Sequence, residues 1–406
     1  MSTAQWYHGL GIRDRGWHHV GMEFSRNTVT IRIAIDLSYL ACPSCGSRDV
    51  IRHGQVERRL LAGQMNFKRM ILSLGLQRVK CRSCGVVRQI KIGFADGNRR
   101  YTKQFERYVL ELSREMTIQG VARHLGVSWD VVKDIQKRYL GRRFGKPRLK
   151  DLRVIAIDEI YMGKRYRFRT VVMDLETGAV VFVGEGKAAS ALDPFWKRLD
   201  RTKAKILAVA ADMSAAYMQA VREHLPGAVM VLDHFHVIKL FNEKLTQLRR
   251  DIYWETTDLL HREVLKGTRW LLVKNWGNLS DKRNEKKRLL EALRINEPLA
   301  TAYYMKEELG ILWKQQDKPS ANSFLNDWIA RAQVSGVRML QKFAQTLATH
   351  QAAILAYYDY PISTGPLEAT NNKIKTMQRQ AYGYRDLEFF ILKIYAAHTM
   401  KYALVG

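Results

Sequence analysis

The stretch LRVIAIDEIYM, residues 152–162, decides the fold class of this chain. Its apolar residues run almost without interruption, which is typical of a buried strand, and acidic residues lie near its end. Further strand-like and helical stretches follow in the order strand, strand, helix, strand, helix, strand, at residues 168–178, 179–186, 187–200, 205–214, 215–226 and 228–237. This order predicts an α/β sheet that is antiparallel first and parallel later.

The composition indicates a folded protein with a polyanionic partner. The 406 residues are enough for two to four domains, and 47% of them are hydrophobic, which supports a large core. The formal net charge of +28 points most often to nucleic acid, and less often to an anionic membrane surface or a solvated face. No apolar run is long enough to span a membrane and no signal peptide opens the chain, so no membrane partner is expected.

The positive charge is concentrated in the first third of the sequence. Residues 1–150 hold 29 Lys and Arg against 11 Asp and Glu, so we expect this part to bind DNA most strongly. The segment GRRFGKPRLKD, residues 141–151, is a basic linker containing Gly and Pro, and its Arg142 and Arg143 are candidates for DNA contacts.

The four cysteines of the chain form two Cys-x-x-Cys pairs: Cys42, Cys45, Cys81 and Cys84. A glycine follows each pair, and two such knuckles supply the four thiolates that tetrahedral Zn²⁺ takes. The 35 residues between the pairs contain strand-like stretches that would form the hairpins of a zinc ribbon. The alternatives are a redox pair or free buried thiols. Pairing without a spare cysteine favours structural zinc in a reducing, cytoplasmic compartment.

Residues 102–140 have the pattern of helices, including a helix-turn-helix. Thr102 is a plausible N-cap, a short helix over 118–125 meets a turn at Gly126, and Ser128 is the N-cap of a second helix. Apolar residues occupy the packing positions Ala122, Leu125, Val127, Val132 and Ile135. The second helix would enter the major groove and expose Ser128, Trp129, Asp130, Lys133 and Lys137. An ordinary helical hairpin is the alternative.

Strand-like stretches disappear between about residues 237 and 360, where the sequence is helical and rich in Lys and Arg. This sequence pattern predicts an all-helical insertion. Its tryptophans are expected to be core residues more often than platforms for stacked bases: Trp254, Trp270, Trp276, Trp313 and Trp328.

Two acids, Asp158 and Asp212, each end a predicted strand, where sites are built in open α/β sheets. If the strands are neighbours, the carboxylates come close, and convergent carboxylates in a basic protein suit Mg²⁺ or Mn²⁺ held against a phosphodiester. Glu159 would point to the opposite face from Asp158, and Asp174 precedes a turn that it more often serves. The alternative for Asp158 and Asp212 is helix capping or loop polarity.

The stretch GPLEATNNKIKTMQRQ, residues 365–380, places one acid before two amides and several bases. As a helix it puts these polar residues on one face: Glu368, Asn371, Asn372, Lys375 and Arg379. Ile374 and Met377 lie on the opposite face, which can pack. The alternative for Glu368 is capping, because Pro366 at the first helical position would make it the N3 residue.

These motifs in this order resemble the DDE transposases of bacterial insertion sequences, most closely the family usually called ISL-three. The resemblance rests on the cysteine knuckles, the helix-turn-helix, AIDEI, AADMSAAY, LDHFHVIK and GPLEATNNKIK…QAYGYR, and it covers Cys42 to about Tyr395. It implies a ribonuclease-H-like core with a helical insertion before the third acid. Carried over to this chain, the acids are Asp158, Asp212 and Glu368, spaced by 54 and 156 residues.

The resemblance also implies a mechanism and partners. The acids would hold two Mg²⁺ (or Mn²⁺) ions, metal-activated water would cleave the 3′ ends of an insertion sequence, and the freed hydroxyl would attack target DNA. The partners would be the terminal inverted repeats and target DNA, bound by a homodimer or larger assembly in the bacterial cytoplasm, associated with the nucleoid. Phosphates beside the metal would be oriented or neutralised by Asn371, Asn372, Lys375 and Arg379. Asp233 and His236, expected to end the last strand, are second-tier candidates, and a satisfied buried histidine is about as expected.

The predicted fold class is a multidomain α/β protein. Its regions are an N-terminal zinc-ribbon region, a helix-turn-helix with linker, the first part of a ribonuclease-H-like core, a helical insertion, and the C-terminal helices of the core with the third acid, at 1–95, 96–150, 151–237, 238–360 and 361–406. Two alternatives remain open from the sequence: a ribonuclease-H-like DNA nuclease or resolvase without strand transfer, and a zinc-containing helix-turn-helix regulator.

Overall fold

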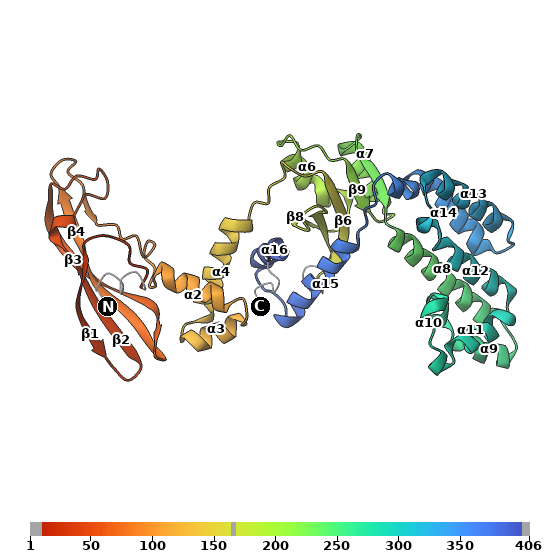
Figure 1. Ribbon diagram of the computed structural model, residues 1–406, viewed down its shortest axis with the longest axis horizontal. Coiled ribbons are helices and arrows are strands. Elements are labelled where there is room, and N and C mark those ends of the chain that lie inside the picture. The colour runs from red at the N-terminus through yellow and green to blue at the C-terminus, as the bar shows by residue number, and fades with distance from the viewer. Residues whose placement is uncertain (1–9, 164–167, 400–406) are drawn as a thin grey trace. The chain divides into compact units, whose positions relative to one another are not determined.

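The computed structural model describes residues 10–163 and 168–399, which form two compact units. Within the described residues, one unit contains the chain up to Lys146 together with Met377–Lys393. The other contains Pro147–Thr376 together with Ile394–Thr399 (Figure 1). The predicted regions 1–95, 151–237 and 361–406 each extend into residues outside the described part.

A mixed sheet dominates the beginning of the first unit. Its strands are β1 (Trp17–Phe24), β2 (Thr28–Ile35), β3 (Val50–Met65), β4 (Lys68–Cys81) and β5 (Val87–Gln89). The order is β1-β2-β4-β3, with β2 parallel to β4 and with β5 also paired to β4. The long β3–β4 hairpin turns at Asn66 and Phe67, whose φ angles of 48° and 62° are those of a two-residue hairpin turn. The 35-residue gap between the cysteine pairs is therefore one extended hairpin.

Three helices follow the sheet: α2 (Lys103–Leu112), α3 (Ile118–Leu125) and α4 (Trp129–Phe144). The predicted N-caps are confirmed, because the hydroxyls of Thr102 and Ser128 accept the backbone N–H groups of Phe105 and Val131. Gly126 has φ of 63°, a left-handed conformation that favours glycine and ends α3. Of the predicted packing residues Val127 is half-buried, and the others are buried. The helix-turn-helix prediction is confirmed.

The second unit begins with a five-stranded sheet. Its strands are β6 (Val154–Tyr161), β7 (Phe168–Asp174), β8 (Val180–Glu185), β9 (Ala208–Ala211) and β10 (Val229–Leu232). The order is β10-β9-β6-β7-β8; β6, β7 and β8 are antiparallel, and β9 and β10 are parallel to β6. This is the predicted arrangement and that of a ribonuclease-H-like core. The last strand stops at Leu232, earlier than predicted, because a helix begins at His234.

Helices pack on one face of this sheet. α6 (Asp193–Leu199) and α7 (Ala215–His224) pack on one face through Phe195, Trp196 and Val221, against Ile155 and Ile157. Side chains alternate along a strand, so Asp158 points to the opposite face. Towards the end of the described residues lie two further helices, α15 (Gly365–Gln380) and α16 (Leu387–Ala396).

An all-helical segment separates β10 from α15, as predicted (Figure 1). Its helices are α8 (His234–Glu255), α9 (Leu259–Lys266), α10 (Arg269–Leu272), α11 (Glu285–Arg294), α12 (Glu297–Leu309), α13 (Lys318–Val334) and α14 (Arg338–Leu355). The expectation that its tryptophans lie in the core is right for Trp328, which is fully buried. It is wrong for Trp254 and Trp270, which are 68% and 67% exposed, and for Trp276, which is also exposed. Trp313 is partly buried against the core.

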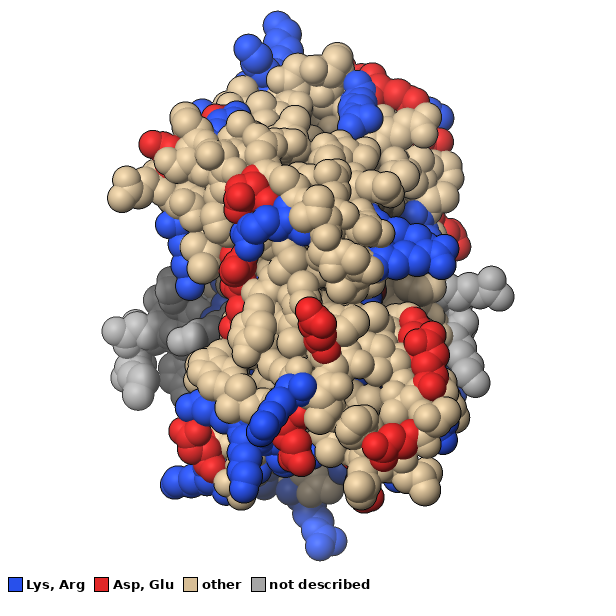
Figure 2. Space-filling view, turned by 90° about the vertical axis from the view of Figure 1, so that its right-hand side faces the viewer, with Lys and Arg blue, Asp and Glu red and all other residues tan. Residues whose placement is uncertain are grey.

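The surface of this helical segment carries both signs of charge on the face drawn in Figure 2, where Lys and Arg alternate with Asp and Glu between uncharged side chains. A mixed surface of this kind does not produce the one-signed field that attracts a polyanion. Among the described residues, none of the helices is both long enough and apolar enough to cross a membrane.

Candidate functional site

Two of the three predicted acids lie next to each other where β9 ends beside β6 in the core sheet. β6 and β9 are parallel neighbours with Ile157 opposite Ala211. Asp158 directly follows Ile157, and Asp212 directly follows Ala211. Asp158 does not end its strand as predicted, because β6 continues to Tyr161 by pairing with β7. Asp158 is 9% exposed, and Asp212 is half-buried just past the end of β9.

Burial is the main influence on the charge of Asp158. It raises the pKa of this carboxyl to about 6, and the neighbouring charge of Asp212 adds to the increase. The backbone N–H of Glu159, which donates to Asp158 Oδ1, and the charge of His236 act in the opposite direction. A carboxylate held in this environment gains from any cation that offsets its charge.

Asn371 connects α15 to this pair of acids. Its Nδ2 donates to Asp158 Oδ2 at 2.8 Å, and the side chain is only 4% exposed. Asn371 therefore lies on the buried stripe of α15 with Leu367 and Ile374, and not on the exposed polar face where the helical pattern placed it. Its amide is engaged with Asp158, which makes it a group that positions this carboxylate.

The third predicted acid, Glu368, lies in the first turn of α15 and is half-buried. Its backbone N–H bonds to the carbonyl of Thr364 at 2.8 Å, so the helix begins one residue earlier than the capping alternative assumed. The Thr364 hydroxyl donates to buried Asp233 at 2.5 Å, which ties the start of α15 to the residue after β10. The carboxylate oxygens of the three acids do not all lie within 4.8 Å of one another.

The other candidate acids have structural partners. Asp174 accepts the N–H of Glu176 and the hydroxyl of Thr177, so it serves the turn as expected. Asp212 Oδ1 accepts the N–H of Ser214, the N-cap residue of α7, so Asp212 shapes the turn before this helix and does not cap it.

The second-tier residues Asp233 and His236 do not end a strand, because β10 stops at Leu232; His236 lies in the first turn of α8 and is half-buried. Burial alone would raise the pKa of Asp233, but hydrogen bonds from His234 and Thr364 lower it.

The four cysteine sulfurs converge at the base of the long hairpin. They lie within 4.8 Å of one another, and two of the pairs, Cys42–Cys84 and Cys45–Cys81, are 3.6 Å apart. Four thiolates ~2.3 Å from one ion at tetrahedral angles would be ~3.8 Å apart, so the donor set fits Zn²⁺. The N–H groups of Cys45 and Ser44 point at the Cys42 sulfur and lower the pKa of its thiol to about 6. This cluster supports a structural zinc ion.

The predicted recognition helix α4 exposes only part of its expected surface. Ser128, Trp129 and Asp130 are exposed, but the side chains of Lys133 and Lys137 are 23% and 30% exposed. The structure places both ammonium groups beside Asp386, at 3.0 and 3.2 Å, and Lys137 also pairs with Glu388 at 2.6 Å. To bind DNA phosphate, these lysines must exchange carboxylate partners for phosphate.

Asp386 was missed by the sequence reasoning, although it has a detectable signal. It precedes α16 and accepts the N–H of Phe389, as an N-cap does. Burial alone would raise its pKa, but the N–H of Phe389 and the charges of Lys133 and Lys137 outweigh burial and lower the pKa to about 2.

We expect Asp386→Asn to loosen the contact between α4 and α16. Asparagine caps helices as well as aspartate, so the substitution removes the charge and keeps the cap. The loss should be about 1 kcal/mol, or about fivefold faster amide hydrogen exchange in both helices. Because the pKa in the folded state lies below the ordinary 3.8, the difference should be full above pH 4 and shrink as the pH falls towards 2. Glu388→Gln is the matched control, since Glu388 is 74% exposed; an equal effect of both variants would contradict the role of Asp386.

The remaining predicted DNA contacts are exposed side chains. They are Arg142 and Arg143 at the end of α4, and Asn372, Lys375 and Arg379 along α15. Arg143 also donates to the Tyr139 hydroxyl at 2.8 Å.

Comparisons with known proteins agree with this geometry. Family models match at residues 155–394, described as a transposase; at 90–140, described as the helix-turn-helix domain of transposase family ISL3; and at 39–84, described as the zinc-finger of transposase IS204/IS1001/IS1096/IS1165. The transposase for insertion sequence element IS1001 of Bordetella parapertussis is 33% identical, over 98% of this chain and 97% of that protein.

Two further relatives are more distant. The transposase for insertion sequence element IS1557 of Mycobacterium tuberculosis is 27% identical over 77% of this chain and 75% of that protein. Among solved structures, the Drosophila P element transposase strand transfer complex is 11% identical with a TM-score of 0.40, covering 76% of this chain and 95% of that one. The family match over most of the core and the full-length identity lead to one conclusion. The chain belongs to the ISL3 family of transposases.

Proposed function

We propose that this DNA transposase binds the terminal inverted repeats of its own insertion sequence, cleaves their 3′ ends by metal-dependent hydrolysis, and joins them to target DNA. The observation that carries the proposal is the meeting of Asp158 and Asp212 on adjacent parallel strands, with Asn371 of α15 bonded to Asp158. Glu368, three residues before Asn371, is the third acid of the proposed site. The nuclease and regulator alternatives are not favoured by the family membership.

The donor set supports Mg²⁺ or Mn²⁺, because hard cations take carboxylate oxygens. Asp158 has a raised pKa from burial, and the Oδ1 atom of Asn371 is buried beside it without a hydrogen-bond partner. Asp158, Asp212 and Glu368 would hold the ions. Two bound ions would activate the attacking oxygen and stabilise the leaving one.

The side chains around the acids would align the DNA. Asn371 would hold the Asp158 carboxylate in one orientation through its 2.8 Å bond. Phosphates of the scissile strand would be met by the exposed residues of α15: Asn372, Lys375 and Arg379. His236, whose charge is felt at Asp158, would help to offset the negative charge of the carboxylates.

Recognition of the element ends would belong to the first unit. Ser128 and Trp129 at the exposed start of α4 would reach base edges in the major groove, and Arg142 and Arg143 would contact phosphates. Lys133 and Lys137 would join them after leaving Asp386. Two DNA ends must be paired for joining, so a dimer or larger assembly on DNA in the bacterial cytoplasm is proposed.

A joining assay tests the proposal. The full-length protein is mixed with labelled duplex from the element's end, a supercoiled target plasmid and Mg²⁺. The expected result is a 3′ nick at the element boundary, followed by label covalently attached to the plasmid. Cutting without attachment would favour the nuclease, and specific binding without cutting would favour the regulator; either result would overturn strand transfer.

A further inference from the structure

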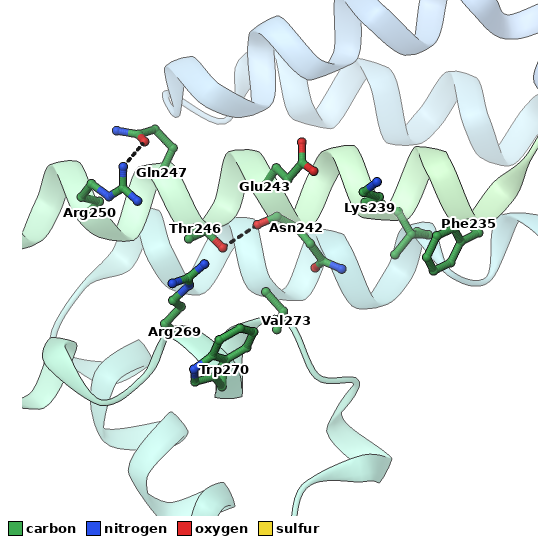
Figure 3. A pocket seen from close by; sticks show the side chains of 11 residues that line it. Phe235, Lys239, Asn242, Glu243, Thr246, Gln247, Arg250, Arg269, Trp270 and Val273 are labelled. Carbon is green, nitrogen blue, oxygen red and sulfur yellow. Dashed lines mark hydrogen bonds between the residues drawn. The ribbon is translucent and has the colours of Figure 1, made fainter. Parts of the chain in front are cut away.

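A hollow on the surface of the helical segment has no role in the function proposed above. Its volume is about 470 Å³, within the range of roughly 300–1,000 Å³ common for ligand sites. Residues of α8 and of Arg269–Val273 line it. Figure 3 shows Asn242 and Thr246 on the side of α8 that faces Arg269 and Trp270, while Glu243 and Gln247 project from the other side. The lining combines two aromatic rings, three cations and several amide or hydroxyl groups.

A broad stripe of α8 contributes to the hollow. Its residues recur at steps of three or four, so they follow one another along the helix: Phe235, Ile238, Lys239, Asn242, Glu243, Thr246, Gln247 and Arg250. From Phe235 to Arg250 this stripe is roughly 22 Å long. The lining holds Lys239, Arg250 and Arg269 against the single acid Glu243, so it is net positive.

Trp270, the tryptophan that lines the hollow, is held in place by buried neighbours in α10. In α10, Leu271 and Leu272 are buried in the core of the helical segment, while Trp270 is 67% exposed. The guanidinium of Arg269 lies 4.7 Å from the centre of the Trp270 ring (Figure 3). A large aromatic face held in this way beside a cation, and left open to solvent, is a platform for a flat ring.

The hollow starts beside the candidate active site. Phe235 directly precedes His236, whose charge acts on Asp158. Asp233, just before α8, is bonded to Thr364 at the start of α15. A DNA strand that runs from the candidate active site along α8 therefore meets the residues that line the hollow.

We propose that this hollow binds an unpaired nucleotide of the DNA strand next to the cleavage point. The base stacks on Trp270, and the adjoining phosphates contact Lys239, Arg250 and Arg269. A paired duplex covers its base faces by stacking, so only an unstacked base can cover the tryptophan. This inference rests on the proposed function, since the DNA strand is the one cut at Asp158, Asp212 and Glu368.

Trp270→Ala tests the inference, with Trp254→Ala as its matched control. Trp254 is 68% exposed, lies on the same helical segment and does not line the hollow. The probes are two forms of the element's end DNA without divalent metal, one fully paired and one with a short unpaired extension at the cleavage point. We expect Trp270→Ala to weaken binding of the unpaired form by roughly 5- to 150-fold, and of the paired form by less than about twofold. Trp254→Ala should change neither, and Trp270→Phe should restore most of the affinity.

Equal affinities of Trp270→Ala and Trp254→Ala for the unpaired form would overturn the inference. A change in sedimentation of Trp270→Ala with unaltered DNA binding would also overturn it, and would assign the surface to a second copy of the chain. Binding is measured without cleavage, so this test is independent of the joining assay. If the wild-type protein joins DNA ends and Trp270→Ala binds the unpaired form normally, the proposed function stands. Only the role of the hollow is then rejected.

Discussion

Glu368→Gln and Asp158→Asn should each abolish cleavage and joining while leaving binding of the element's end DNA unchanged. Each substitution replaces a carboxylate of the proposed metal site by a neutral amide of nearly the same shape. Rates should fall by roughly three orders of magnitude or more, the scale expected for losing one preorganised electrostatic group at a reacting centre. Single-turnover cleavage of labelled end DNA in Mg²⁺ measures the loss, and gel mobility of the complex measures the binding.

Asp174→Asn is the matched control for these variants. Asp174 is an 8% exposed acid in the same sheet, and its carboxylate accepts hydrogen bonds from Glu176 and Thr177 in the turn that follows β7. Asparagine keeps one acceptor oxygen for the N–H of Glu176, and its Nδ2 can donate to the Thr177 hydroxyl in place of the second bond. The turn should therefore be retained, and cleavage should stay within a few-fold of wild type. If Glu368→Gln cleaved as fast as Asp174→Asn, Glu368 would have only a structural role in the first turn of α15. The third metal ligand would then be another residue.

The sheet and the helix-turn-helix were predictable because their signals are local. A buried strand needs a run of apolar residues, and helix ends need hydroxyl caps and a glycine that accepts positive φ. The caps Thr102 and Ser128 and the turn at Gly126 are examples, since each depends only on residues within four positions. The predicted end of β6 at Asp158 is wrong, because acidic residues also occur inside a strand that has a pairing partner. Glu159 and Tyr161 remain in the strand through pairing with Thr170 and Phe168.

The contacts of the candidate site depend on partners that are remote in sequence. Asn371 lies at the border between the polar and apolar faces of α15, and a helical pattern cannot say on which side it falls. Its burial follows from a hydrogen bond to Asp158, 213 residues away. The lysines of α4 are a similar case, because Asp386 is 249 residues from Lys137. Local patterns identified the residue types, and long-range packing determined what they contact.

Removing zinc should unfold the two cysteine knuckles and leave the rest of the N-terminal sheet in place. Few other contacts join the two knuckles. A hydrogen bond links Ser47 and Ser83, and Arg82 is joined to Asp49 by a backbone hydrogen bond and an exposed ion pair. The sheet has its own apolar core, including Leu60, Leu72 and Val79, each of which is fully buried. Without a metal the four sulfurs lose the ion that would hold them together, so this end of the hairpin loses its main cross-link.

Cys81→Ser tests this expectation, because Cys81 ends β4 and is fully buried. Bound zinc should fall from one ion per chain to none, and amide exchange should rise steeply at 42–50 and 79–89 but change little at 60–74. Binding of end DNA should weaken by at least about tenfold, since an unfolded binding segment must be ordered on the DNA. Ser83→Ala, within the same knuckle, removes only the Ser47 hydroxyl contact and should keep the zinc. Full DNA binding by zinc-free protein with four reactive thiols would mean that the knuckles fold without the metal and that the ion is dispensable for end recognition.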